Sequence, residues 1–255
     1  MTQHDHADVY VITGAAGGIG SAVAQKLAEN KNRVVITDVD AEHGTAMAKK
    51  IAAETGALIR FEKLDVSDAK AVEALAAKLE QEDWSVYGLM ANAGIAPSSS
   101  AIDYPDDLWR KTMAINLDGV FWCCRTFARG MLQRKRGAIV VTSSIAGSGV
   151  VRPETHAAYG ASKAAVAHLA ALLGVEWAKK GVRVNAVAPG YTQTPILDKL
   201  KEESPDIFST WMNDTPIGRL VQPREIANAT AFLLSEEASA ITGVTLPVDG
   251  GYAAR

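Results

Sequence analysis

Short β-branched runs alternate with longer alanine-rich segments along nearly the whole chain, and this alternation constrains the fold more than any other feature. "DVYVITG" at 8–14 is followed by "GIGSAVAQKLAEN" at 18–30, and "RVVITD" at 33–38 is followed by "AEHGTAMAKKIAAETG" at 41–56. Strands joined by helical crossovers pair in parallel, and the helices then cover both faces of the sheet. The pattern predicts an α/β fold built on a doubly wound parallel sheet.

The alternation continues to the end of the 255 residues, with seven strand candidates and six or seven helices. The remaining strand candidates cover 58–66, 86–94, 137–144, 182–190 and 243–251. No linker or repeat divides the chain, so we expect one domain over 1–255. Residues 191–219 interrupt the rhythm with mixed polar and aromatic side chains, which is typical of a lid or binding loop over the carboxyl ends of the strands.

Composition excludes several classes of function. A net charge of −3 with no basic stripe argues against nucleic acid or an anionic membrane as partner. The first ten residues lack the apolar core of a secretion signal and no segment is typical of a membrane span, so we expect a cytoplasmic protein. The two cysteines, Cys123 and Cys124, are adjacent and are expected to be small buried side chains in a reducing compartment, with no metal site.

A glycine-rich run, "TGAAGGIG" at 13–20, follows the first strand candidate and leads into a helix. Glycines at such a turn let the backbone approach a pyrophosphate, which the helix start attracts through its free N–H groups. Asp38 ends the second strand candidate, where a carboxylate can accept hydrogen bonds from an adenosine ribose. An acid there repels a 2'-phosphate, and neither Thr37 nor Val39 supplies a cation for one. The pattern predicts a dinucleotide site that favours NAD over NADP.

Tyr159 and Lys163 are the only large polar side chains of "YGASKAA", and they lie four residues apart. On a helix this spacing puts them on one face within reach of each other. A neighbouring ammonium favours the phenolate and lowers the pKa of a tyrosine, so the pair could act as an acid/base. The same spacing also occurs in ordinary helices, where the tyrosine packs and the lysine is solvated.

Seven motifs in order resemble the short-chain dehydrogenase/reductase family over essentially the whole chain. They are "TGAAGGIG" at 13–20, "LDV" at 64–66, "NAG" at 92–94, Asn116 in "MAINLDG", "SSIAG" at 143–147, "YGASK" at 159–163 and "APGYTQT" at 188–194. The resemblance implies a Rossmann fold and reversible hydride transfer between a secondary alcohol and a nicotinamide, without a metal in the chemical step.

The resemblance also assigns catalytic roles. Tyr159 would be the acid/base, Lys163 would lower its pKa and hold the nicotinamide ribose, and Ser144 would hydrogen-bond the substrate oxygen. Asn116 would support a water chain from Lys163 to solvent. We therefore expect Asn116, Ser144, Tyr159 and Lys163 to form the catalytic group.

The cofactor residues expected from the motifs form a larger set. Besides Tyr159 and Lys163 they are Gly14, Gly18, Ile19, Gly20, Asp38, Val39, Asp65, Val66, Asn92, Ala93, Gly94, Pro189, Gly190, Thr192 and Thr194. Among these, Thr192 and Thr194 are expected to face the carboxamide.

The segment between Ser144 and Tyr159 is two residues longer than in many members of the family. Together with "VRPETHAAY", "IFSTWMNDTPIGR" and "VDGGY", this spacing resembles bacterial polyol dehydrogenases of the family and favours a polyol or sugar alcohol as substrate. The candidate substrate contacts are Ser144, Arg152, His156, Tyr191 and Trp211. Arg152 could equally be a solvated loop charge, His156 could be structural, and Trp211 could belong to the core of the lid.

Two other functions stay open. A 3-oxoacyl-thioester reductase or another ketone reductase would share the motifs, although thioester reductases usually use NADPH. A redox sensor that binds nicotinamide without turnover would need no acid/base, so the complete catalytic group argues against it. The small side chains around Tyr159, including Ala157, Ala161 and Ala165, allow helices to pack closely and imply a homotetramer by resemblance.

Overall fold

The computed structural model describes residues 8–194 and 205–254, and these residues form a seven-stranded, entirely parallel sheet in the order β3-β2-β1-β4-β5-β6-β7. The strands are β1 (Val9–Thr13), β2 (Arg33–Asp38), β3 (Ile59–Lys63), β4 (Val86–Ala91), β5 (Gly137–Thr142), β6 (Val182–Pro189) and β7 (Thr245–Val248). The predicted doubly wound sheet is confirmed, and each of the seven strand candidates contains one strand.

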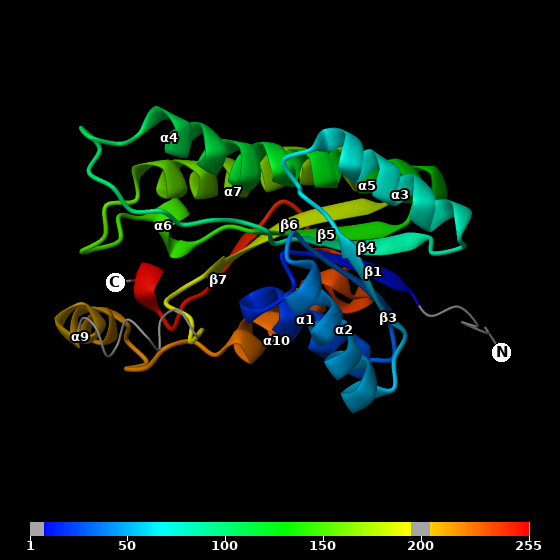
Figure 1. The fold of residues 1–255 in the computed structure, drawn as a ribbon, viewed down its shortest axis with the longest axis horizontal. Helices are drawn as coiled ribbons and strands as arrows, with labels where there is room; N and C mark the ends of the chain where they lie inside the picture. Colours follow the sequence, from blue (N-terminus) through cyan, green and yellow to red (C-terminus); the bar gives the residue numbers. More distant parts are fainter. Residues whose placement is uncertain (1–7, 195–204, 255) are drawn as a thin grey trace.

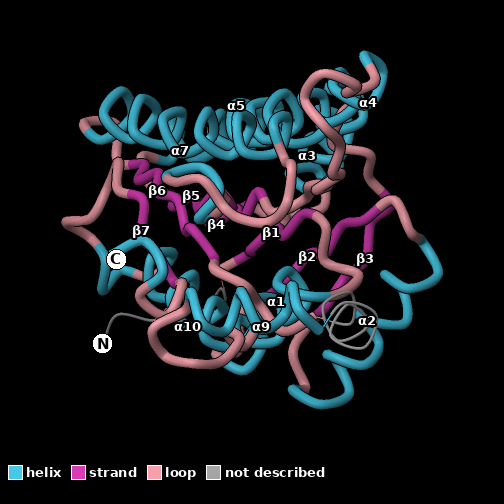
Figure 2. Tube along the Cα trace, turned by 90° about the vertical axis from the view of Figure 1, so that its left-hand side faces the viewer, coloured by secondary structure: helices cyan, strands magenta, loops and turns pink. Residues whose placement is uncertain are grey.

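Helices cover both faces of this sheet (Figures 1 and 2). One layer holds α1 (Gly18–Glu29), α2 (Ala41–Thr55) and α10 (Pro223–Leu234), and the other holds α3 (Ala69–Gln81), α4 (Asp106–Met113), α5 (Gly119–Arg134) and α7 (Ala157–Ala178). The residues of β1 alternate between the two layers: Val9 and Val11 belong to the core with α3, α5 and α7, and Tyr10 and Ile12 to the core with α1, α2 and α10. A strand buried on both faces reads as a continuous apolar run, as "VYVI" does.

The strand order reverses between β1 and β4, since the chain first adds β2 and β3 on one side and later strands on the other. The crossovers leave these two neighbouring strands in opposite directions, which opens a crevice at their carboxyl ends. Asn92 spans this point, because its Nδ2 donates to the carbonyl oxygens of Thr13 and Gly14, each at 3.0 Å. The crevice is where the glycine-rich run, Asp38 and the "NAG" motif meet.

Three local features differ from the sequence-based expectation. The segment from α4 to α5 is helical throughout but contains a π-helical turn, η1 (Ala114–Asp118), which short sequence periodicity does not predict. A short helix, α6 (Ile145–Ser148), follows β5, and the expected lid at 191–219 contains α9 (Pro205–Asp214). The part of that lid between 195 and 204 lies outside the described residues. Short 3-10 turns, η2 (Glu236–Ala238) and η3 (Tyr252–Ala254), flank β7.

By length and composition alone, α7 could cross a membrane, with 22 residues and a mean hydropathy of 1.2 over an 18-residue window. The core helix of a folded domain can pass this test, so the result does not overturn the sequence-based expectation. The helix instead packs against the sheet, with Val166, Ala170 and Trp177 in the core. It is apolar because one side is buried in the fold and the other carries small residues together with the exposed Leu172 and Val175.

Candidate active site

The glycine-rich bend between β1 and α1 brings backbone segments unusually close together. Gly14 has φ +64°, and a Cβ there would lie 2.7 Å from Cα of Ala93, whereas a Cβ at Gly20 would lie 2.5 Å from the carbonyl oxygen of Gly14. Only glycine fits these positions. Gly17 precedes the helix without a side-chain cap, and the first turn of α1 has no acidic residue. The N–H groups of this helix start can therefore bind an anion such as phosphate.

Two carboxylates stand at the ends of neighbouring strands beside this bend. Asp38 accepts hydrogen bonds from the backbone N–H of Ala16 at 3.0 Å and of Asp40 at 3.1 Å. Asp65 accepts from both the N–H and the hydroxyl of Ser67, at 2.9 and 2.7 Å. These donors fix the orientation of both carboxylates, so that each can present its remaining lone pairs to hydroxyl or amine groups of a ligand.

A cleft of about 730 Å³ lies at the carboxyl ends of the strands, which is within the range of cofactor sites. Ten of the expected cofactor residues line it: Gly14, Gly18, Asp38, Val39, Asp65, Val66, Asn92, Ala93, Gly94 and Thr194. The cavity fits a dinucleotide, because it lies between the glycine-rich helix start, which can bind phosphate, and the Asp38 carboxylate, which can accept hydrogen bonds from a ribose. The structure thus assembles most of the expected set at one place.

The other expected cofactor residues support the cleft from behind. Ile19 packs against the core beneath α1. Pro189 is buried at the end of β6, and a Cβ at Gly190 would lie 2.7 Å from Cα of Asp249. Thr192 is also buried, and its hydroxyl donates to the carbonyl oxygen of Gly190 at 2.8 Å. Of the two threonines expected at the carboxamide, only Thr194 lines the cleft. The hydroxyl of Thr192 instead forms a hydrogen bond within its own loop.

Asn116 lies within the π-helical turn, a kind of irregularity that is frequent at functional sites. Its side chain is fully buried and forms two hydrogen bonds with the backbone of Ile95. Oδ1 accepts from the N–H at 2.9 Å, and Nδ2 donates to the carbonyl oxygen at 2.8 Å. The same amide donates to the hydroxyl of Ser162 at 3.1 Å. Asn116 therefore fixes the strand-to-helix loop after β4 against α7.

Lys163 points from α7 into the interior beside Asn116. Its Nζ donates to the carbonyl oxygen of Thr142 at 2.7 Å, and burial lowers its pKa to about 8. A Cβ at Gly94, which lines the cleft, would lie 3.4 Å from this Nζ and 3.2 Å from Oδ1 of Asn116. Two members of the expected catalytic group, Lys163 and Asn116, thus reach the cleft at Gly94.

Tyr159 and Ser144 are neighbours at the end of β5 and the start of α7. Burial raises the pKa of Tyr159, and a side-chain hydrogen bond with Ser144 acts in the opposite direction. Nζ of Lys163 lies 5.6 Å from the centroid of the Tyr159 ring, and its hydrogen bond is directed to Thr142. The expectation that Lys163 lowers the pKa of Tyr159 is therefore not met in this geometry, because burial dominates.

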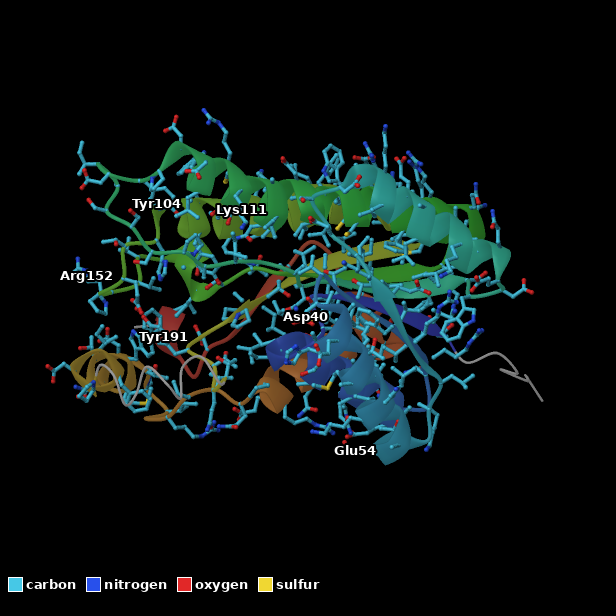
Figure 3. All side chains as sticks on the ribbon, viewed as in Figure 1. Asp40, Glu54, Tyr104, Lys111, Arg152 and Tyr191 are labelled. Carbon is cyan, nitrogen blue, oxygen red and sulfur yellow. The ribbon has the colours of Figure 1, made fainter. Side chains whose placement is uncertain are left out.

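Two candidate substrate contacts lie on the loop before α7. Arg152 is exposed at the outer end of the molecule (Figure 3), as expected for a solvated charge, and contributes its backbone carbonyl to a contact with Tyr191. His156 shares a hydrogen bond through Nδ1 with the carbonyl oxygen of Pro97 at 3.0 Å, and its ring centroid lies 5.7 Å from that of Tyr159. His156 thus supports Tyr159 and the loop at 97–99 simultaneously.

Tyr191 and Trp211 form a stacked pair, with ring centroids 4.4 Å apart and an interplanar angle of 17°. Trp211, on α9, is only 2% exposed, which fits the alternative that it belongs to the core of the lid. The hydroxyl of Tyr191 donates to the carbonyl oxygen of Arg152 at 3.2 Å and to Oε2 of Glu154 at 3.4 Å. Tyr191 therefore joins α9 to the loop before α7.

Sequence reasoning missed five residues that line the cleft: Gly17, Leu64, Ile95, Lys111 and Ile115. Gly17, Leu64 and Ile115 lie inside the recognised motifs and Ile95 directly follows one, so counting every motif residue and its next neighbour would have found these four. Lys111 carries no motif signal. It lies one helical turn before Ile115, and only the packing of α4 beside the cleft brings it there.

A family model described as enoyl-(acyl carrier protein) reductase matches residues 14–253. Among similar curated proteins, the galactitol 2-dehydrogenase (L-tagatose-forming) of Cereibacter sphaeroides is 43% identical over 94% of this chain and 93% of its own. The chain belongs to the short-chain dehydrogenase/reductase family of oxidoreductases.

Solved structures agree with this membership. NAD+-bound xylitol dehydrogenase has a TM-score of 0.90 at 30% identity and covers 98% of this chain and 100% of its own. A variant of actinorhodin polyketide ketoreductase with NADPH has a TM-score of 0.92 at 32% identity, covering 100% of both chains. Both nicotinamide cofactors thus occur among structures that share this fold.

Proposed function

We propose that this protein catalyses reversible hydride transfer between a secondary alcohol and NAD, with a polyol or sugar alcohol as substrate. The observation that carries the proposal is that Lys163 and Asn116 reach a dinucleotide-sized cleft at Gly94. Lys163 shares helix α7 with Tyr159, which has Ser144 as its hydrogen-bond partner. A nucleotide-binding protein without turnover would need the cleft alone. The buried lysine and the paired hydroxyls favour an enzyme over a redox sensor.

The bound nicotinamide would accept or supply the hydride, and the chain would handle the proton. Ser144 hydrogen-bonds the substrate oxygen, while Tyr159 takes the hydroxyl proton in oxidation and returns it in reduction. Burial raises the pKa of Tyr159, which favours the protonated phenol that donates its proton in reduction. In oxidation the phenol would first release its proton, so that the phenolate takes the hydroxyl proton of the alcohol. Lys163, with a pKa of about 8, can exchange protons near neutral pH, and Asn116 holds the loop that shapes this buried site.

Asp38 supports NAD as the cofactor, because its fixed carboxylate would accept the ribose hydroxyls and repel a 2'-phosphate. Lys63 lies in register with Asp38 on β3 and is a cation that the sequence reading did not connect with it. This neighbour keeps NADP as the alternative. Asp38→Asn removes the repulsion but keeps the shape, so the ratio of NAD to NADP affinity should fall about tenfold. An unchanged ratio measured by nucleotide titration would contradict the role of Asp38.

The polyol assignment is supported by the similarity to galactitol and xylitol dehydrogenases, and by the longer loop before Tyr159. We further propose that residues 191–219 act as the substrate lid, since Tyr191 links α9 to that loop. A 3-oxoacyl-thioester or other ketone reductase is the alternative within the family; the description of the matching family model also names a reductase of acyl thioesters, although of the enoyl group.

The decisive test follows absorbance of reduced nicotinamide with NAD or NADP against hexitols, pentitols, vicinal diols, aldoses and 3-hydroxyacyl thioesters. Turnover of one polyol group with NAD is the expected result. Turnover of thioesters alone would replace the polyol assignment by the reductase. Binding of NAD without turnover of any alcohol, with Tyr159→Phe behaving like the wild type, would favour the sensor.

A further inference from the structure

Lys111 is the one cation among the described residues that line the cleft, and no motif predicted it. It lies on the exposed side of α4, one turn before Ile115, which lines the same cavity. Residues four apart on a helix share a face, so the side chain of Lys111 extends along the wall to which Ile115 contributes. Figure 3 shows Lys111 descending from the α4 layer, with Asp40 across the crevice in the α1 and α2 layer.

The charged side chains that line the cleft differ in how many hydrogen bonds they already form with the protein. Asp38 and Asp65 each accept two hydrogen bonds from neighbouring N–H or hydroxyl groups. Lys111 forms no ion pair or hydrogen bond with any described residue, whereas the adjacent Arg110 pairs with Asp106 at 3.4 Å. The ammonium of Lys111 is therefore the charged group of the cleft with its full bonding capacity left for a ligand.

Among the described residues, the opposite wall, at the start of α1, offers an anion N–H donors but no positively charged side chain. At the start of α1, N–H groups point into the cleft without a side-chain cap or a nearby acid, but the described wall there carries no cation. A pyrophosphate has two negative charges and several exposed oxygens, so it can bind donors from two sides. A cation from α4 would complete the arrangement that the helix start begins.

We propose that Lys111 binds the pyrophosphate of the dinucleotide from the side opposite α1, closing the cleft over it. This inference rests on the proposed nicotinamide function and adds a residue that holds the cofactor. A lysine suits this position because it is a flexible point charge that can swing aside when the cofactor enters or leaves.

The test is a binding measurement that needs no turnover. We would determine dissociation constants of NADH, NADP, ADP-ribose and adenosine by calorimetry for the wild type, Lys111→Gln and the control Arg110→Gln, which removes a charge from the adjacent exposed position. Lys111→Gln should weaken NADH and ADP-ribose roughly three- to tenfold and leave adenosine unchanged. It should also flatten the dependence of ADP-ribose binding on salt between about 0.05 and about 0.5 M. Lys111→Arg should restore most of the affinity, and Arg110→Gln should bind like the wild type.

Three outcomes would overturn the proposal. Equal affinity of the wild type and Lys111→Gln for ADP-ribose would show that the ammonium does not contact phosphate. An equal loss for adenosine would show that Lys111 only shapes the cleft, and a loss confined to NADP would place it at the 2'-phosphate. Failure of the wild type itself to bind NADH and ADP-ribose would instead contradict the proposed function, so the two failures can be told apart.

Discussion

At the scale of single residues, the hydroxyl of Tyr159 is the most direct probe of the chemistry. Tyr159→Phe removes the proton that the proposed reaction needs but keeps the ring that packs on His156. We expect turnover to fall about 10²- to 10⁴-fold with NAD affinity retained. Tyr104→Phe is the matched control, because its hydroxyl is buried without a hydrogen-bond partner among the described residues. A loss of less than tenfold in steady-state assays of Tyr159→Phe would indicate another proton donor.

Lys163 gives a second prediction at this scale, because its pKa falls from an ordinary value of 10.5 to about 8. Between these pH values the unfolded chain binds more protons at this site than the folded chain, so the contribution of Lys163 to the free energy of unfolding rises with pH. Relative to Lys163→Met, the wild type should gain about 1 to 3 kcal/mol from pH 8 to pH 10.5. Urea unfolding at several pH values measures this. If the difference in the free energy of unfolding between the wild type and Lys163→Met did not change with pH, as for the exposed control Lys179→Met, the site would not lower the pKa of Lys163.

At the scale of elements, Tyr191 is the link between α9 and the loop before α7. Tyr191→Phe keeps the stack on Trp211 and the edge contact with Tyr252, whose ring centroid lies 5.7 Å away, but removes the bonds to Arg152 and Glu154. Because a hydrogen bond contributes about 1 kcal/mol, we expect KM for the alcohol to rise roughly fivefold. The dissociation constant of NADH should stay the same, because Tyr191 does not line the proposed cofactor cleft. Equal changes in both constants would contradict a role confined to the substrate loop.

At the scale of the whole molecule, α7 presents an uncovered stripe of mostly apolar side chains. Ala161, Ala164, His168, Leu172 and Val175 recur every three or four residues and are exposed, Leu172 at 55% and Val175 at 77%. A stripe of this kind is typical of a helix that packs against another helix. We propose that it forms one interface of a homotetramer of 27.0 kDa chains. Val175→Glu should shift the mass measured by light scattering to a smaller species. Leu58→Glu, at an exposed apolar site outside α7, should leave the mass unchanged. A wild-type protein that is monomeric at micromolar concentration would contradict the proposal.

The sequence by itself determined the parallel sheet and the glycine-rich bend, and it identified Asn116 and Lys163, the two residues that lie beside Gly94. All of these depend on local periodicity or on short motifs. Strand alternation requires only neighbouring residues, and a glycine at a close approach is specified by its own backbone. Tertiary structure decided what depends on distant segments. Packing against Tyr191 buried Trp211, and the bond to Thr142 directed the ammonium of Lys163 to the backbone instead of to Tyr159. The packing of α4 beside the crevice brought Lys111 to a cofactor cleft, because a side chain's environment is set by whichever elements fold against it.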